Sequence, residues 1–238
     1  MASPLTGSVI RPCGEDAFVV EFGDTILPEH SAAVAKLTKA FDEAALPGVR
    51  EVVPTFRSVL VQFDPDTTSE TELVDAIGAE VAGEAERETR TFSIPVCLHG
   101  EMAEDIDEMA AELAMPTDDV RAGIVRSRLQ VGMFGFAPGF IYLSGLDPIL
   151  ELPRRKSPRP PMPKGSMIIA AGMAGLSPAV MPTGWYVVGQ TAVELWRPEQ
   201  TPKTPFEVGD YLKVCPVDEA TIRELAKDPT GGVEELRP

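Results

Sequence analysis

The feature that most constrains the fold is a change of pattern beyond residue 129. Residues 135–191 are dense in glycine and proline and lack the three-to-four-residue spacing of apolar side chains that marks a helix. Short apolar runs appear within and after this segment, at residues 167–171, 185–188, 193–196 and 211–214. Many short strands joined by Gly/Pro turns are typical of barrels and sandwiches. The second half of the chain is therefore predicted to be a β-barrel or a β-sandwich.

The first ninety residues instead alternate between strand and helix patterns. Apolar side chains recur at spacings of three and four after Ser31, and the capping box Ser69-Glu70-Thr71-Glu72 begins a second helical pattern. The expected strands are 17–22, 49–54, 58–63 and one near 91–97. The order strand–helix–strand–strand–helix–strand predicts a ferredoxin-like α+β layer.

The remaining segments set the expected domain limits. Residues 101–128 carry helical periodicity interrupted at Pro116, and they lead into the strand-rich half. The end of the chain is polar and contains Pro-Thr-Gly-Gly, which favours a loosely held tail. We therefore expect an α+β protein with a ferredoxin-like domain over residues 1–90, a strand-rich domain over 91–225 and a loosely ordered tail over 226–238.

Charge is unevenly distributed along the 238 residues, which carry a formal net charge of −16. Residues 64–119 hold 17 acidic and 2 basic side chains, whereas residues 121–165 hold 8 basic and 2 acidic ones. A chain this acidic is not expected to bind nucleic acid through bulk electrostatics. The acidic block is typical of a solvated face, and the basic block coincides with the Gly/Pro-dense segment.

The N-terminal residues and the cysteines give no sign of export or of metal binding. The N-terminus lacks a basic stretch followed by an apolar run, and no segment reaches about 20 uninterrupted apolar residues, so a cytoplasmic protein is expected. The three cysteines, Cys13, Cys97 and Cys215, are far apart and form no metal-type spacing with the two histidines. Buried reduced thiols are the expected state, although Cys97 and His99 would face the same side of a strand.

The Gly/Pro-dense segment contains three motifs that together suit an anion. The loop at residues 135–140, Gly-Phe-Ala-Pro-Gly-Phe, can present backbone N–H groups and two aromatic rings at fixed positions. Pro153-Arg154 and Pro158-Arg159 each set a guanidinium beside a stiff proline, and residues 163–166 add a turn with an ammonium and a hydroxyl. The alternative is that the loops are barrel corners and the basic side chains are solvated. No P-loop, dinucleotide fingerprint, nucleophile elbow or zinc-protease motif identifies a reaction.

The order of these motifs resembles that of one protein family. Residues 135–143 match a GFxPGFxYL loop, and the two Pro-Arg dipeptides and a PxGS turn follow it. After these, residues 169–172 match a small-residue strand, residues 183–185 a GGW-like turn and residues 189–191 a GRT-like ending. Residues 14–17, 53–54 and 105–106 also fit. Over nearly the whole chain, to about residue 217, the sequence resembles the family of the 5-oxoprolinase B subunit, KipI and allophanate hydrolase subunit 1, also described as the carboxyltransferase subdomain C/D family.

This resemblance implies an N-terminal α+β domain followed by a cyclophilin-like β-barrel. It implies that the chain works with a homologous second subunit of the 5-oxoprolinase C or KipA type, alongside a lactamase A-type subunit. The implied reaction opens the 5-oxoproline lactam to glutamate, with ATP, and Mg²⁺ where it accompanies ATP, bound at the level of the complex. Because half of the cleft would be missing, the isolated chain is expected to be inactive.

The resemblance also gives candidate roles to residues of the motif segment. Four side chains are expected to stabilise the charge that develops when the amide oxygen is phosphorylated, and these candidate catalytic residues are Arg154, Arg159, Lys164 and Ser166. The candidate substrate-binding residues supply an apolar wall and backbone donors: Phe136, Pro138, Gly139, Phe140, Tyr142 and Gly165. No metal ligands are expected.

Two other functions stay open on the sequence alone. A KipI-like regulator would bind a histidine kinase through the barrel and would be antagonised by its partner subunit. One half of a biotin-dependent carboxyltransferase, as in urea amidolyase, would work beside a chain that carries a biotinoyl Met-Lys-Met motif, which this sequence does not contain.

Several residues depart from the family pattern. A histidine is expected where residues 124–126 read Ile-Val-Arg, and Gln190 stands in place of the arginine of the GRT-like ending. Ser177 replaces a tyrosine, Thr183 replaces a glycine of the GGW-like turn, and residues 98–100 read Leu-His-Gly at a YGG-like turn. Loss of a histidine and an arginine favours a different substrate or a divergent member.

Overall fold

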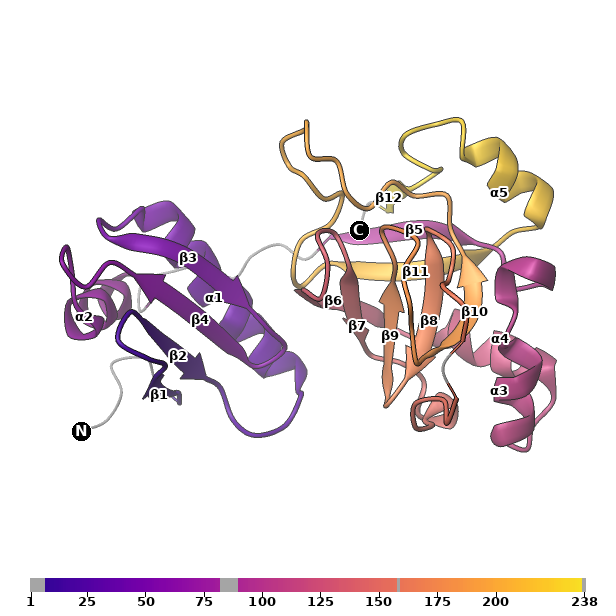
Figure 1. The fold of residues 1–238 in the computed structure, drawn as a ribbon, viewed down its shortest axis with the longest axis horizontal. Coiled ribbons are helices and arrows are strands. Elements are labelled where there is room, and N and C mark those ends of the chain that lie inside the picture. The colour runs from indigo at the N-terminus through magenta and orange to yellow at the C-terminus, as the bar shows by residue number, and fades with distance from the viewer. Residues whose placement is uncertain (1–6, 82–89, 158, 237–238) are drawn as a thin grey trace. The chain divides into compact units, whose positions relative to one another are not determined.

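The computed structural model describes residues 7–81, 90–157 and 159–236, and the chain divides into two compact units (Figure 1). The first unit is Met1–Glu88 and the second is Thr89–Pro238. Each unit has its own sheet and its own apolar core, so each is described separately. None of the helices in the described residues is both long enough and apolar enough to cross a bilayer.

The first unit is a four-stranded antiparallel sheet in the order β1-β2-β4-β3, with two helices on one face (Figure 1). Its elements are β1 (Val9–Pro12), β2 (Ala17–Glu21), α1 (Pro28–Ala44), β3 (Val49–Pro54), β4 (Ser58–Phe63) and α2 (Glu70–Val81). Alternate residues of β4 are buried because Val59, Val61 and Phe63 face the helices. The predicted strands and helices of this unit are therefore present.

The strand expected to complete a ferredoxin-like sheet is not in this sheet. That strand is β5 (Thr91–Val96), and it belongs to the sheet of the second unit. The edge place next to β2 is taken instead by β1, four residues that precede the predicted pattern and pair with β2 as a hairpin. Sequence order alone suggested the wrong partner for β5, because a strand pattern carries no information about which sheet it joins.

The second unit is an eight-stranded sheet that closes into a barrel. The order is β10-β8-β9-β7-β6-β11-β5-β12. Beyond the end of β5, the Cys97 N–H donates to the Gln190 carbonyl at 2.9 Å and the Gln190 N–H donates back at 3.0 Å, which joins β10 to the β5 side. The strands after β5 are β6 (Leu129–Phe134), β7 (Ile141–Ser144), β8 (Ser166–Ala170), β9 (Met173–Leu176), β10 (Tyr186–Gln190), β11 (Tyr211–Pro216) and β12 (Glu234–Leu236). Of the two predicted architectures, the barrel is the one observed.

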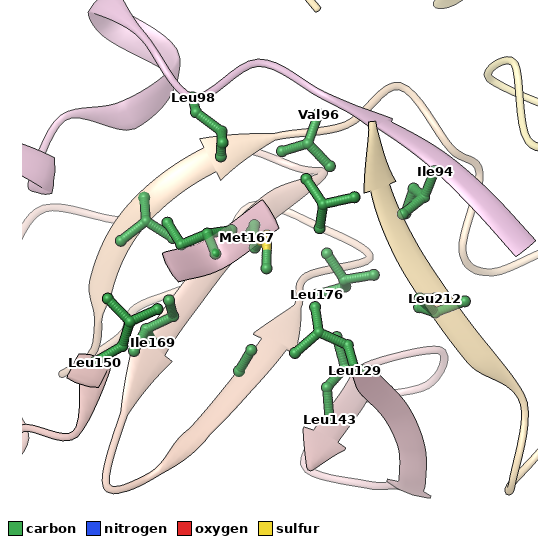
Figure 2. Packing of buried hydrophobic residues seen from close by; sticks show 14 of the residues in the cluster. Ile94, Val96, Leu98, Leu129, Leu143, Leu150, Met167, Ile169, Leu176 and Leu212 are labelled. Atoms are coloured by element: carbon green, nitrogen blue, oxygen red, sulfur yellow. The ribbon is translucent and has the colours of Figure 1, made fainter. Parts of the chain in front are cut away.

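Apolar side chains from all sides of the barrel fill its interior (Figure 2). Strand residues such as Met167, Leu176 and Leu212 point toward one another there. Two helices that precede the barrel motif, α3 (Ile106–Glu112) and α4 (Thr117–Arg126), add Met109 and Ile124 to the same core. The short elements η1 (Gly100–Ala103), η2 (Pro148–Leu150) and α5 (Glu219–Leu225) complete the unit.

A second, smaller apolar layer covers the outer face of the barrel at β8. Met167 and Ile169 point into the barrel core, whereas Ile168 and Ala170 belong to an outer cluster that includes Phe140 and Trp185. All five residues of β8 are buried because both of its faces are covered. The loops of the Gly/Pro-dense segment are therefore packed onto the barrel wall.

The end of the chain is held more firmly than its composition suggested. β12 pairs antiparallel with β5, where Glu235 lies opposite Phe92. Before it, Gly231 has a φ of +59°, and a Cβ added there would lie 2.5 Å from the backbone of Ala192 and Val193. A tail that adds a strand and packs its backbone this closely is part of the second unit, and polarity alone concealed the pairing.

Candidate functional site

The predicted Gly-Phe-Ala-Pro-Gly-Phe loop joins β6 to β7 and is held by hydrogen bonds and close packing. Within it the Gly135 N–H donates to the Phe140 carbonyl at 3.2 Å, and the Ala137 N–H donates to the Gly135 carbonyl at 2.8 Å. Gly139 has a φ of +79°, and a Cβ there would lie 2.7 Å from the Cβ of Trp196. Two of the backbone donors expected to meet a substrate are therefore used inside the loop.

Phe136 projects from this loop in an unusual backbone conformation. Its φ is +68°, a left-handed value that a bulky side chain rarely adopts, and 72% of its surface is exposed. The exposed Pro138 lies beside it in the loop. The loop thus places an aromatic ring in solvent at a conformational cost.

Four aromatic rings form a continuous row from this loop across the outer face of the barrel. The ring centroids are 5.6 Å apart for Phe136 and Phe140, 4.8 Å for Phe140 and Tyr142, and 6.0 Å for Tyr142 and Trp185. Gly175 leaves room for the row, since a Cβ there would lie 3.2 Å from the Phe140 ring. Phe140 and Trp185 are buried, so they support the row while Phe136 is its exposed end.

Arg154 lies at the other end of this aromatic row. Its guanidinium carbon is 6.0 Å from the centroid of the Trp185 ring, within the range of a cation–π contact. Among the described residues, no carboxylate lies within ion-pair distance of Arg154, and the residue is exposed. It therefore offers an uncompensated positive charge beside an apolar wall.

Arg155 and Arg159 have the opposite environment. Arg155 pairs with Asp105 at 2.9 Å and with Glu108, and Arg159 pairs with Asp105 and Glu104. The Arg159 side chain is 5% exposed. We refer to Glu104, Asp105, Glu108, Arg155 and Arg159 as the ion-pair network; it commits the Arg159 guanidinium to two carboxylates.

The turn before β8 holds the other two candidate catalytic side chains. Lys164 pairs with Glu194, and the buried Ser166 hydroxyl donates to the Pro163 carbonyl at 2.7 Å. Gly165 has a φ of +79°, and a Cβ there would lie 2.1 Å from the Thr191 carbonyl oxygen. This turn is held by close backbone packing.

The four candidate catalytic side chains do not converge on one point. Ser166 lies opposite Gln190 on β10, whereas Ile169 lies opposite Tyr186, next to Trp185 and the Arg154 side chain. Three residues of extended strand span about 10 Å. Arg154 and the Lys164–Ser166 turn therefore lie near opposite ends of β8, and Arg159 is bound in the ion-pair network.

Two participants were missed at the sequence level, Asp105 and Arg155. Asp105 was noticed only as part of a family motif, and Arg155 stood between two motif positions. The available signal was the complementary charge of the acidic block before residue 119 and the basic block after 121. The structure joins those blocks, since the network pairs acidic residues at η1 and α3 with arginines of the Gly/Pro-dense segment.

Burial also changes the acid–base properties of this end of β8. Burial raises the pKa of Tyr186, and the nearby carboxylates of Glu112 and Glu108 raise it further, against the opposing effect of Arg155.

The Cys97 thiol lies 3.6 Å from the His99 carbonyl oxygen, and the imidazole of His99 is at the exposed surface, so these residues form no thiol–imidazole pair. Within the described residues, no cluster of histidine, cysteine or acidic side chains is placed to hold a metal ion.

Of the positions that depart from the family pattern, Thr183 lies beside Trp185, whose N–H it accepts at 3.1 Å, whereas Ile124, Ser177 and Gln190 have partners elsewhere on the barrel. Ile124 is fully buried in the barrel core, and Gln190 donates through its side-chain amide to the Lys164 carbonyl at 2.8 Å. The Ser177 hydroxyl donates to the Ala179 carbonyl at 2.6 Å. The substituted residues thus serve packing and local hydrogen bonding in this chain.

These features define a mixed α/β protein with two sheets, whose closed barrel carries on its outer face an aromatic row and an arginine that forms no ion pair with a described residue. The chain belongs to the carboxyltransferase domain family, subdomain C and D, whose model matches residues 8–206. The resemblance predicted from the motif segment is thereby confirmed.

Two curated relatives extend over most of the chain. The chain is 31% identical over 224 residues to the 5-oxoprolinase B subunit of Bacillus subtilis, covering 88% of this chain and 93% of the relative. It is 28% identical over 212 residues to the 5-oxoprolinase B subunit of Escherichia coli O157:H7, covering 87% of this chain and 94% of the relative. The similarity therefore includes both units.

Solved structures share the fold. The structure of the protein TTHA0988 matches with a TM-score of 0.75 and 26% identity, covering 88% of this chain but only 40% of that longer chain. The urea amidolyase of Kluyveromyces lactis matches with a TM-score of 0.74 and 17% identity, covering 96% of this chain and 16% of that chain. At that identity the second match shows the fold alone.

Proposed function

We propose that this chain is the B-type subunit of an ATP-dependent hydrolase that opens 5-oxoproline or a related cyclic amide. The observation that carries the proposal is the 31% identity to a 5-oxoprolinase B subunit across 93% of that protein. The match includes the motif segment that forms the aromatic row and presents Arg154. The proposal names the system in which the chain works, since no single residue of the chain defines the reaction.

Arg154 is the anion-binding group in this proposal. 5-Oxoproline has a carboxylate next to a small apolar lactam ring, and Arg154 with the aromatic row offers a cation next to an apolar wall. A guanidinium binds a carboxylate through charge-assisted hydrogen bonds, which are stronger than neutral ones. We assign Arg154 to the substrate carboxylate, Phe136 to the rim of the site, and Phe140, Tyr142 and Trp185 to its support.

Arg159, Lys164 and Ser166 have structural roles in this proposal. Arg159 is paired with two carboxylates, Lys164 with one, and the Ser166 hydroxyl with a backbone carbonyl. The Arg159 guanidinium and the Ser166 hydroxyl would lose these partners if they turned toward a developing charge, and Lys164 lies at the end of β8 away from Arg154. ATP would supply the phosphoryl group that makes the amide oxygen a leaving group, and we assign the ligands of ATP and of any accompanying Mg²⁺ to the partner subunits.

A homologous partner subunit would complete the site. The relatives are named as one lettered subunit of 5-oxoprolinase, which indicates a multi-subunit system, and the TTHA0988 chain is long enough to hold much more than this chain's counterpart. Arg154 and Phe136 are exposed on the outer face of the barrel, where a partner can reach them. We propose a homologous subunit of the C type in that place and a lactamase A-type subunit as the third member.

The test is reconstitution with the homologous subunits encoded beside this chain. The purified complex should release glutamate from 5-oxoproline in the presence of ATP, and activity should vanish when this chain or ATP is omitted. The isolated chain should be inactive. An assembled complex that leaves 5-oxoproline and other cyclic amides unchanged would contradict the proposal, as would turnover by the chain alone.

The second candidate is one half of a biotin-dependent carboxyltransferase. The matching family model describes a carboxyltransferase domain, and the fold matches part of a urea amidolyase. The two functions differ in their requirement for biotin. Activity that depends on a biotinylated partner and is abolished by avidin would favour this candidate, whereas lactam opening that avidin leaves unchanged would favour the hydrolase.

A further inference from the structure

We infer that Asp105 is a positioning residue that holds Arg154 against Trp185. The inference rests on the proposed role of Arg154 as the anion-binding group, and it adds a residue far away in sequence. Asp105 precedes α3 and is 6% exposed. It lies at the centre of the ion-pair network, which fixes the segment that carries Arg154.

Asp105 is bound to the barrel through both its backbone and its side chain. Its N–H donates to the Val187 carbonyl at 2.9 Å, and its Oδ2 accepts from the Val187 N–H at 2.7 Å. The same carboxylate also pairs with the guanidinium groups of Arg155, at 2.9 Å, and of Arg159. One carboxylate therefore connects β10 with two arginines of the loop outside it.

Arg155 transmits this restraint to the site. Its N–H donates to the Gly184 carbonyl at 2.9 Å, and its guanidinium lies 5.4 Å from the Tyr186 ring centroid. Arg154 is the chain neighbour of Arg155, and Trp185 lies between Gly184 and Tyr186. Arg154 is thus bonded directly to Arg155, and Trp185 lies between the two residues, Gly184 and Tyr186, that Arg155 contacts.

The two network arginines depend on their carboxylates. In the described structure the Nε atoms of Arg155 and Arg159 are buried and have no hydrogen-bond partner. Their terminal nitrogens are bound by Asp105, Glu108 and Glu104. A neutral side chain at 105 would leave two partly or fully buried guanidinium groups short of a counter-charge, and the loop would lose its fixed position.

Substitutions of graded severity separate positioning from general stability. Asp105→Asn keeps an acceptor for the Val187 N–H but removes the charge. Glu108→Gln removes only the half-exposed outer partner of Arg155, so it provides the test if Asp105→Asn does not fold. Glu112→Gln is the matched control, because Glu112 lies on the same helix but outside the ion-pair network, and its one ion pair among the described residues is with the exposed Lys156, at 3.9 Å.

The kinetic experiment uses the assembled complex with 5-oxoproline and ATP. Asp105→Asn should raise KM for 5-oxoproline about tenfold and Glu108→Gln about threefold, with kcat within twofold, because uniform substrate binding is weakened. Glu112→Gln should leave both values unchanged. In an Arg154→Ala background Asp105→Asn should add no further rise in KM; an equal further rise, or an unchanged KM in a folded single variant, would overturn the inference.

A fluorescence experiment tests the same inference without relying on the reaction. In a Trp196→Phe background Trp185 is the single tryptophan, since the chain has two. Asp105→Asn and Glu108→Gln should shift its emission in the direction of the shift caused by Arg154→Ala, and Glu112→Gln should not. Emission shifts in the purified chain, with no lactam activity in the assembled complex, would overturn the proposed function alone. Unchanged emission in folded Asp105 and Glu108 variants of the chain would overturn the positioning role.

Discussion

The two ends of β8 are built from similar motif residues and have different physical characters. At one end the turn of Lys164, Gly165 and Ser166 is held by backbone contacts, with the Gly165 carbonyl accepting from the Thr191 N–H at 2.9 Å. At the other end the ion-pair network holds the loop through charged side chains, and Arg154 pairs with no carboxylate in the part of the chain that the structure describes. The two dipeptides look equivalent in sequence, but Pro163-Lys164 belongs to a structural turn, whereas Pro153-Arg154 presents the proposed binding group.

This difference explains how a family motif can contain both structural and functional residues. The turn at Gly165 is expected to tolerate few substitutions because there is no space for a larger side chain. Arg154 is expected to tolerate few because its charge would bind the substrate. Both restrictions look the same in a sequence motif. Only the partners of each side chain distinguish them.

The largest expected effect on stability is at the Lys164–Ser166 turn, the end of β8 that is held by backbone contacts. Gly165→Ala should lower the free energy of unfolding by about 3 kcal/mol, because a Cβ would lie 2.1 Å from the Thr191 carbonyl oxygen in a left-handed conformation. Gly172→Ala, at the other end of β8, should cost about 1 kcal/mol, since Gly172 has a similar φ of +72° with nothing within 4 Å. Chemical denaturation measures both, and equal losses would contradict the role of close packing at Gly165.

A smaller effect is expected at the hydroxyl of the same turn. Ser166→Ala should lower the free energy of unfolding by about 1 kcal/mol, because the hydrogen bond to the Pro163 carbonyl is lost. Activity of the assembled complex should stay within about twofold of wild type, which is under 0.5 kcal/mol of barrier. A complex that assembles normally but loses most of its kcat would show that Ser166 acts directly in the reaction.

The smallest effect is a pH dependence at the charged end. Because the pKa of Tyr186 is raised by burial and then by Glu112 and Glu108, the folded state favours the neutral phenol. This stabilisation is fully present below the unfolded pKa of about 10 and is lost as the pH rises through the folded value. Relative to Tyr186→Phe, the wild type should therefore lose stability above about pH 10 in denaturation experiments. A difference between the two proteins that stays constant with pH would contradict this environment.

Much of the first unit could be predicted from sequence because its elements follow simple periodicities. The helix α1, which begins at Pro28 rather than after Ser31, the helix α2, which begins at Glu70, and the alternation of Val59, Val61 and Phe63 all follow from local signals. The pairing of β5 was not predictable, because it lies parallel to β11, more than a hundred residues later. Such pairing depends on tertiary contacts that no local pattern contains.

The candidate site was predicted in part. Glycine, proline and aromatic spacing predicted a loop that carries Phe136 and Phe140, and the structure has it between β6 and β7; the binding role of Arg154 stays a prediction. Arg154 and Arg159 follow a proline in the same way, and only the acidic residues Glu104 and Asp105 make them different. A charge partner more than fifty residues away cannot be assigned from the dipeptide itself.

The most direct test compares the two ends of β8 within the assembled complex. Arg154→Ala should raise KM for 5-oxoproline about 10- to 100-fold, which corresponds to roughly 1.5–3 kcal/mol for a lost charge-assisted hydrogen bond. Lys164→Ala should change KM by no more than about twofold, since its exposed pair with Glu194 is worth under about 1 kcal/mol. A large effect of Lys164→Ala with little effect of Arg154→Ala, in complexes that assemble equally well, would place the binding group at the wrong end and contradict the central claim.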